Sequence, residues 1–221
     1  MILSLHQNEM IQYVFSQLKH FFPDGKKVNT LDYKNDFTLA LYRIENCFKH
    51  INNESYCGID GNAYFNYLNS DQYAMFIWFL SNTIWNEKKD SMLSNKLFYL
   101  NKVLHGFSCM YDTQLPDIFI LFHAVGTVLG KAEYSNYFTV THGCTVGAHN
   151  GIYPKIGEKV AMLTNSSIIG DCIIGSNVSI GVHTKIYNKN IENNMVAFTD
   201  DKGEINYKYN KHMSWAEKRF I

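Results

Sequence analysis

The sequence predicts a helical N-terminal domain followed by a parallel β-helix, an α+β chain in which helices and strands occupy separate segments. Two periodicities carry this prediction. Apolar residues recur every three or four positions over residues 5–104, and then every six positions over much of the remaining chain. With 221 residues, 46% of them hydrophobic, the chain can bury a sizeable core. The expected boundaries are 1–112 for the helical domain, 113–198 for the β-helix and 199–221 for a polar tail.

Three apolar stripes in the first segment predict amphipathic or buried helices, and the many aromatic residues there predict a packed bundle. Ser70 or Asp71 is the expected N-cap of the third helix, and residues 23–25 (PDG) form the expected turn after the first. The stripes are Ile11, Val14, Phe15 and Leu18; Leu39, Leu41, Ile44 and Phe48; and Met75, Phe76, Phe79, Leu80 and Ile84.

A six-residue repeat in the second segment predicts short strands joined by turns, stacked as coils around an aliphatic column. Ten residues separate its two blocks, and residues 147–151 (GAHNG) within that gap predict a protruding loop. About ten hexads make a little over three coils, with the helical half expected to cover the first coil. The column consists of Val128, Tyr134, Val140 and Val146 in one block and Ile156, Met162, Ile168, Ile174, Ile180 and Ile186 in the other.

Composition excludes several classes of protein. Lys plus Arg and Asp plus Glu number 20 each, so no basic surplus favours nucleic acid or anionic membranes. Five cysteines without a C-x-x-C pair argue against a disulfide scaffold or a cysteine-rich zinc site. The first residues do not resemble a signal peptide, and the longest apolar runs are too short for a membrane helix. We expect a cytoplasmic protein with no nucleic-acid partner and no membrane insertion.

Residues 122–130 (FHAVGTVLG) resemble the serine acetyltransferase branch of the hexapeptide-repeat acyltransferases. Residues 145–147 (TVG) and 153–157 (YPKIG) continue the resemblance, which covers roughly residues 115–196 at the level of motifs. The family implies a left-handed β-helix, acetyl-CoA as co-substrate and no metal. It also implies a homotrimer, or a dimer of trimers, with active sites between subunits.

The resemblance also implies a catalytic centre around His123 as general base. A neutral imidazole near pH 7 can take a proton from an acceptor hydroxyl or amine as it attacks the thioester. A carboxylate usually fixes the tautomer of such a histidine, and Asp112 and Asp117 are the candidates in the preceding segment. His142 lies nineteen residues after His123, about one coil on, where it is expected to stack beside His123 or line the same groove.

The acetyl-CoA site follows from the family's groove between two β-helices. The matching positions are Gly147, Ala148, Ser166 and Thr184. Lys185 and Lys189, near the last coils, are candidates for the nucleotide phosphates. Backbone amides of the loop at residues 147–151 are candidate donors to the thioester oxygen.

Departures from the family's pattern bear on the acceptor. Serine enzymes carry an acid before the catalytic histidine, where this chain has Phe122, and Arg-His where this chain has Ile152 and Tyr153. Losing these charges removes a means of gripping a zwitterion. Phe122, Tyr153, His149 and Asn150 instead suit a sugar ring, and the motif also looks like acetyltransferases of bacterial surface-polysaccharide pathways. The sequence therefore favours acetylation of a sugar hydroxyl or amino group in surface-polysaccharide biosynthesis.

Three alternatives remain open. The first is serine O-acetyltransferase activity in cysteine biosynthesis. The second is a trimeric zinc hydratase of the same fold, for which His123, His142, His149 and His183 are possible ligands, although no His-x4-His pair occurs. The third is a non-catalytic trimeric scaffold, because a fold alone does not fix a function.

Overall fold

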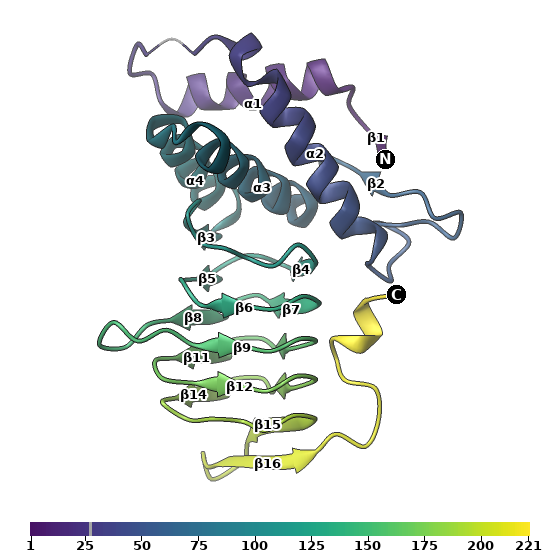
Figure 1. Cartoon of the computed structure of the whole chain (residues 1–221), viewed down its shortest axis with the longest axis vertical. Coiled ribbons are helices and arrows are strands. Elements are labelled where there is room, and N and C mark those ends of the chain that lie inside the picture. The colour runs from purple at the N-terminus through teal and green to yellow at the C-terminus, as the bar shows by residue number, and fades with distance from the viewer. Residues whose placement is uncertain (27) are drawn as a thin grey trace.

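A computed structural model describes residues 1–26 and 28–221. Helices form one end of the molecule and stacked β-coils extend below them, while the C-terminal segment runs back along the stack toward the helices (Figure 1). The predicted order, helical region and then parallel β-helix, is confirmed.

Within the described residues, the helical region contains four α-helices, of which α3 packs against both α2 and α4. Residues 72–84 of α3 are all buried, whereas the other three helices bury one face each. The elements are β1 (Ile2–Leu3), α1 (Gln7–Phe21), a 3-10 helix (Thr30–Tyr33), α2 (Lys34–Lys49), β2 (Tyr64–Phe65), α3 (Ser70–Lys88) and α4 (Ser91–His105).

Two details of the predicted helices are wrong. Leu39 is exposed, and the apolar part of the buried face of α2 begins instead at Phe37. The N-cap of α3 is Asn69, whose side chain accepts hydrogen bonds from the backbone N–H groups of Asp71 and Gln72. Asn is among the best N-cap residues, so Ser70 and Asp71 fall in the first turn of the helix.

The β-helix consists of three parallel sheets, one on each face of a triangular coil. Two faces contain five coil strands each, so the stack has about five coils rather than a little over three. The first face contains β4 (Phe119–Phe122), β7 (Phe138–Thr141), β10 (Ala161–Met162), β13 (Ser179–Ile180) and β15 (Met195–Thr199). The second contains β3 (Ser108–Cys109), β5 (Val128–Leu129), β8 (Thr145–Gly147), β11 (Ser167–Ile169) and β14 (Lys185–Tyr187), and the third contains β6 (Glu133–Tyr134), β9 (Lys155–Ile156) and β12 (Ile173–Ile174).

The aliphatic column fills the interior of the coils. All six predicted residues from Ile156 to Ile186 are buried. Val128, however, is 41% exposed, and the inward residue is its neighbour Leu129, which pairs with Val146 of the next coil. The hexad spacing fails here because five positions, rather than six, separate Leu129 from the next residue of the column, Tyr134, which pairs with Ile156.

The tail is ordered along the first face. Strand β16 (Ile205–Tyr209) pairs antiparallel with β15 and covers the end of the stack. The chain then returns across the first face, where the backbone N–H of Trp215 donates to Ser179 Oγ and Phe220 pairs with Ile51 of the helical region. Strand β3 begins before residue 113 and β15 extends to residue 199. The predicted domain boundaries, after residues 112 and 198, stay predictions.

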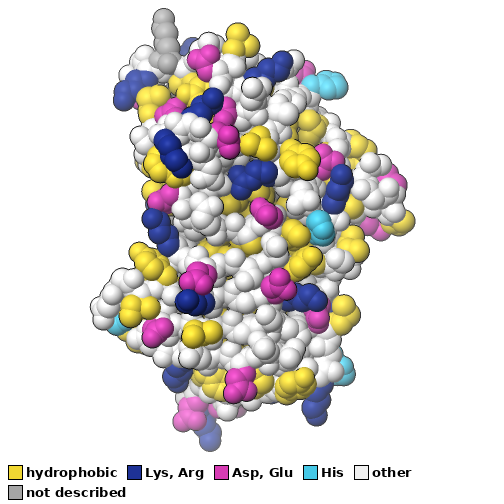
Figure 2. Space-filling model, viewed as in Figure 1, with side chains coloured by type: hydrophobic (Ala, Val, Ile, Leu, Met, Phe, Trp, Pro, Cys, Tyr) yellow, Lys and Arg dark blue, Asp and Glu magenta, His cyan; other side chains and the backbone are white. Residues whose placement is uncertain are grey.

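The surface mixes both signs of charge with apolar side chains, as Figure 2 shows for one side of the molecule. None of the helices within the described residues is long and apolar enough to cross a bilayer. All five cysteines are free thiols, and all are buried.

Candidate active site

His123 lies at an enlarged corner between the first and second faces. Phe122 pairs with Thr141 and Val128 pairs with Thr145, so residues 142–144 join the strands in one coil but residues 123–127 join them in the coil above. The upper corner therefore has two more residues than the lower one. Counted back from Val128, the additional residues are His123 and Ala124.

A carboxylate from the helical region holds this enlarged corner. The backbone N–H of His123 donates to Asp71 Oδ2 over 2.9 Å, and that of Ala124 donates to Asp71 Oδ1 over 3.2 Å. His123 has a φ of 54°, in the left-handed region that non-glycine residues rarely adopt. Asp71 lies fifty-two residues before His123, and sequence reasoning considered it only as a helix cap.

The imidazole of His123 reaches solvent, with 80% of its side chain exposed. Its Nδ1 lies 3.9 Å from Asp71 Oδ2. The ring of His142 follows in the next coil, with the two ring centroids 6.2 Å apart. Nδ1 of His142 is buried without a hydrogen-bond partner in the described part of the chain. The two histidines are thus neighbours, while their catalytic roles stay predictions.

The two carboxylates proposed as orienters lie at other corners. Asp112 follows β3 at the corner between the second and third faces, where its Oδ2 pairs with Lys131 Nζ at 2.8 Å. Asp117 is exposed just before β4, at the corner between the third and first faces. Within the described residues, the carboxylate that contacts His123 is that of Asp71. The orienting role predicted for Asp112 or Asp117 therefore finds no supporting contact within one chain.

The predicted loop leaves the stack between β8 and β9 (Figure 1). His149 and Ile152 exchange backbone hydrogen bonds of 3.1 and 3.0 Å, so these two amides are already used within the loop. The His149 ring hydrogen-bonds with Tyr187 Oη over 2.9 Å, while Asn150 and Tyr153 are exposed. This loop occupies the corner between the second and third faces. Within one chain, the width of the second face therefore separates this loop from His123.

The predicted acetyl-CoA positions divide into two groups. Ser166 and Thr184 are fully buried, and Thr184 Oγ1 accepts from the backbone N–H of Thr199. Because these two side chains are buried, Ser166 and Thr184 could contact a ligand only through their backbone atoms. Ala148, Lys185 and Lys189 are exposed, and a Cβ built on Gly147 would meet no atom within 4 Å. These four residues are accessible from solvent, and their role in binding acetyl-CoA stays a prediction.

Phe122 is half-buried beneath the C-terminal tail. The guanidinium of Arg219 lies 5.2 Å from the centre of the Phe122 ring and 4.3 Å from that of Trp215. The tail thus brings a cation next to the residue that precedes His123. Nothing in the local sequence pattern signals this contact, because it depends on the path of the tail across the first face.

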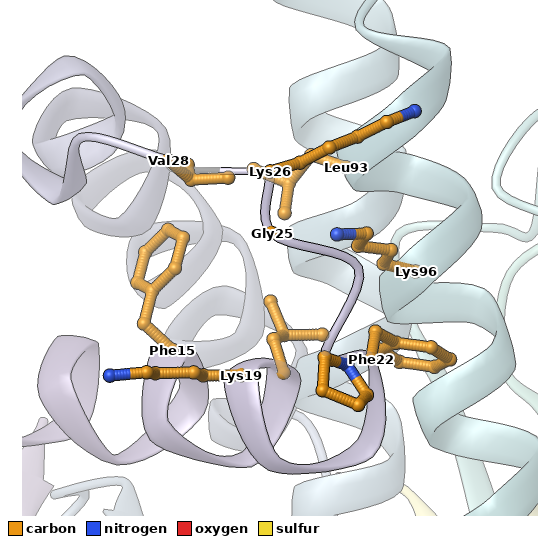
Figure 3. A pocket seen from close by; sticks show the side chains of 10 residues that line it. Phe15, Lys19, Phe22, Gly25, Lys26, Val28, Leu93 and Lys96 are labelled. Atoms are coloured by element: carbon orange, nitrogen blue, oxygen red, sulfur yellow. The ribbon is translucent and has the colours of Figure 1, made fainter.

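A cavity of about 640 Å³ lies in the helical region, between α1, the segment after it and α4 (Figure 3). It shares no residue with the predicted site. The cavity is lined by Phe15, Leu18, Lys19, Phe22, Pro23, Gly25, Lys26, Val28, Leu93 and Lys96.

A metal centre finds no support in the side chains. Across residues 1–26 and 28–221, no three His, Cys, Asp or Glu side chains gather as metal ligands.

Known proteins share this architecture. The crystal structure of serine acetyltransferase from Brucella abortus strain S19 matches with a TM-score of 0.69 and 16% identity, covering 94% of this chain and 85% of that one. The fold is that of the serine acetyltransferases. A serine acetyltransferase solved in complex with CoA matches with a TM-score of 0.65 and 16% identity, covering 90% of this chain and 84% of that one.

Sequence comparison points the same way over a shorter stretch. A serine acetyltransferase of Staphylococcus xylosus is 22% identical over 107 residues, which cover 46% of this chain and 50% of that protein. The matched stretch thus spans half the length of that curated relative. No family model matches the chain. At these identities the serine acetyltransferase fold is established, and activity is a matter for proposal.

Proposed function

We propose that this protein is an acetyl-CoA-dependent O-acetyltransferase whose acceptor is L-serine. The observation that carries the proposal is the position of His123, solvent-exposed at the enlarged corner of a serine acetyltransferase fold. The relative from Staphylococcus xylosus supports the same activity, and the neighbour solved with CoA supports acetyl-CoA as donor.

His123 acts as the general base in this proposal. Acetyl-CoA supplies the acetyl group as a thioester. Nε2 of His123 accepts the proton of the serine hydroxyl while its oxygen forms a bond to the thioester carbonyl carbon. His123 then returns the proton to the sulfur as the carbon–sulfur bond breaks, so O-acetylserine and CoA thiol leave and the imidazole is neutral again.

The complete site requires more than one chain. His123 and the loop with Tyr153 lie at opposite edges of the second face, yet the resemblance assigns both to one centre. A neighbouring copy can place its loop against the His123 corner, which supports a homotrimer or a dimer of trimers. The site would then form between subunits, with the acetyl-CoA groove beside it.

A sugar hydroxyl is the second candidate acceptor. It is favoured by the apolar residues at positions where serine enzymes carry charges, and Ile152 and Tyr153 are indeed about half exposed. However, charges are not absent near His123: Asp71 contacts its backbone, and Arg219 lies over Phe122. These two charges weaken the argument against a zwitterionic acceptor, and the comparisons support serine rather than a sugar.

The test is release of free thiol from acetyl-CoA against a panel of L-serine, nucleotide sugars and oligosaccharides. Saturable turnover on L-serine, with O-acetylserine identified by mass, is the expected result. Turnover on a saccharide but not on serine would replace the proposed acceptor. If the folded protein neither binds acetyl-CoA nor turns over any acceptor, the proposed activity itself is contradicted.

A further inference from the structure

We propose that Asp71 is the positioning residue for His123. Its carboxylate fixes the backbone of the enlarged corner and, through Nδ1 of the imidazole, favours the tautomer in which Nε2 is free to accept a proton. This inference rests on the proposed function, in which His123 is the base. It assigns the orienting role to a residue of α3 rather than to Asp112 or Asp117.

The backbone contacts are the first argument. Asp71 accepts hydrogen bonds from both residues that enlarge the corner, one on each carboxylate oxygen. Those residues lack counterparts in the coil below, so the ladder between coils offers their amides no matching carbonyl. A backbone amide that is removed from water without an acceptor is unfavourable, and Ala124 is buried. Asp71 thus stabilises a backbone at His123 that would otherwise be unfavourable.

The imidazole is the second argument. Nδ1 lies 3.9 Å from Asp71 Oδ2, too far for a hydrogen bond but close enough that rotation of the exposed ring can form one. Catalytic hydrogen bonds are often long before substrate binds and shorten in the complex. Only 16% of the Asp71 side chain is exposed. It lies in the first turn of α3, where the helix dipole favours a negative charge.

A purely structural role is the rival explanation, because Asp71 also joins α3 to the first face of the β-helix. Asp90 offers a matched control for that role. It is the N-cap of α4 and its Oδ1 accepts from the backbone N–H of Leu93 over 3.1 Å, but it does not contact the His123 corner. Loss of stability alone should therefore be similar in Asp71→Asn and Asp90→Asn.

The experiment compares wild type with Asp71→Asn, Asp90→Asn, His123→Asn and the double variant Asp71→Asn/His123→Asn. We expect Asp71→Asn to lower kcat on L-serine by about 10- to 100-fold, with KM for acetyl-CoA within about twofold of wild type. In the His123→Asn background the same change should alter the residual rate by less than about threefold, because the residue that it positions is gone. Asp112→Asn and Asp117→Asn complete the set as the sequence-based rivals.

A measurement without substrate separates this inference from the proposed function. Nitrogen-15 NMR of labelled imidazoles reports which ring nitrogen of His123 carries the proton, with His123→Asn used to assign the signal. We expect the Nδ1–H tautomer to dominate in wild type and to lose population in Asp71→Asn. An unchanged tautomer ratio, equal losses of kcat in Asp71→Asn and Asp90→Asn, or additive effects in the double variant would overturn the role of Asp71, whatever the acceptor proves to be.

Discussion

Asp71 Oδ2 lies 2.9 Å from the backbone nitrogen of His123 and so joins the first turn of α3 to the first face of the β-helix. Apolar contacts reinforce this connection, since the rings of Trp78 and Phe79 each lie 5.5 Å from that of Phe119 in β4. The helical region therefore covers the first coil, as the sequence predicts. Substitutions in the first turn of α3 should therefore alter the backbone at His123 directly.

Acid should weaken the helical region through His105. Burial lowers the pKa of this imidazole to about 4, so between that pH and about 6.5, the ordinary value, the unfolded chain binds a proton that the folded chain does not. Stability therefore falls as the pH drops through this window, by about 2 kcal/mol at pH 5. Urea unfolding at pH 7 and pH 5 should show a smaller loss for His105→Gln than for wild type. His212→Gln is the control, because His212 is exposed and its replacement should leave the wild-type loss of stability unchanged. Equal losses of stability in wild type and His105→Gln would contradict this assignment.

The C-terminal tail should detach more readily when Arg219 is replaced. Its guanidinium contacts the rings of Trp215 and Phe122, and such contacts stabilise by about 0.5–1 kcal/mol at partly exposed sites. Hydrogen exchange of residues 214–220 should become several-fold faster in Arg219→Ala. Arg219→Lys keeps the charge but loses the planar group, so its exchange rate should lie between those of wild type and Arg219→Ala. Unchanged exchange in Arg219→Ala would show that other contacts hold the tail.

The five thiols should be unreactive in the folded protein. All are buried, and burial raises the pKa of Cys47 to about 12, which suppresses the reactive thiolate. Ellman's reagent should label the native protein slowly and all five cysteines after unfolding in guanidinium chloride. Rapid labelling of one thiol under native conditions would indicate local opening, and mass mapping would locate it.

Periodicity predicted the fold because each coil repeats the same requirement for an inward aliphatic residue. The first block illustrates its limit. Val128 fits a spacing of six counted back from Tyr134, but the inward residue is Leu129, only five positions before Tyr134. The two additional residues at His123 break the repeat again, because they place the inward residues Leu121 and Leu129 eight positions apart. The repeat fails where the candidate base lies, which is common at functional sites because local regularity is relaxed there.

The candidate site was predicted only in part for a related reason. Motifs identified His123, and its spacing from His142 predicted two neighbouring rings. Asp71 and Arg219 were missed because they come from α3 and from the tail, and only the packing of these segments against the first face brings them to the corner. Asp112 was chosen for its proximity along the chain, yet the triangular coil turns it to a different corner, where it pairs with Lys131.

The most direct test of the account is turnover of acetyl-CoA and L-serine by His123→Asn beside wild type. Asn tolerates the left-handed backbone at this position, so the variant removes the imidazole without straining the corner. His183→Asn is the matched control, because His183 is an exposed corner histidine with a φ of 58°. We predict that kcat falls by about 100-fold or more in His123→Asn and stays near wild type in His183→Asn, with acetyl-CoA binding retained in both. Near-normal turnover by His123→Asn would contradict the account.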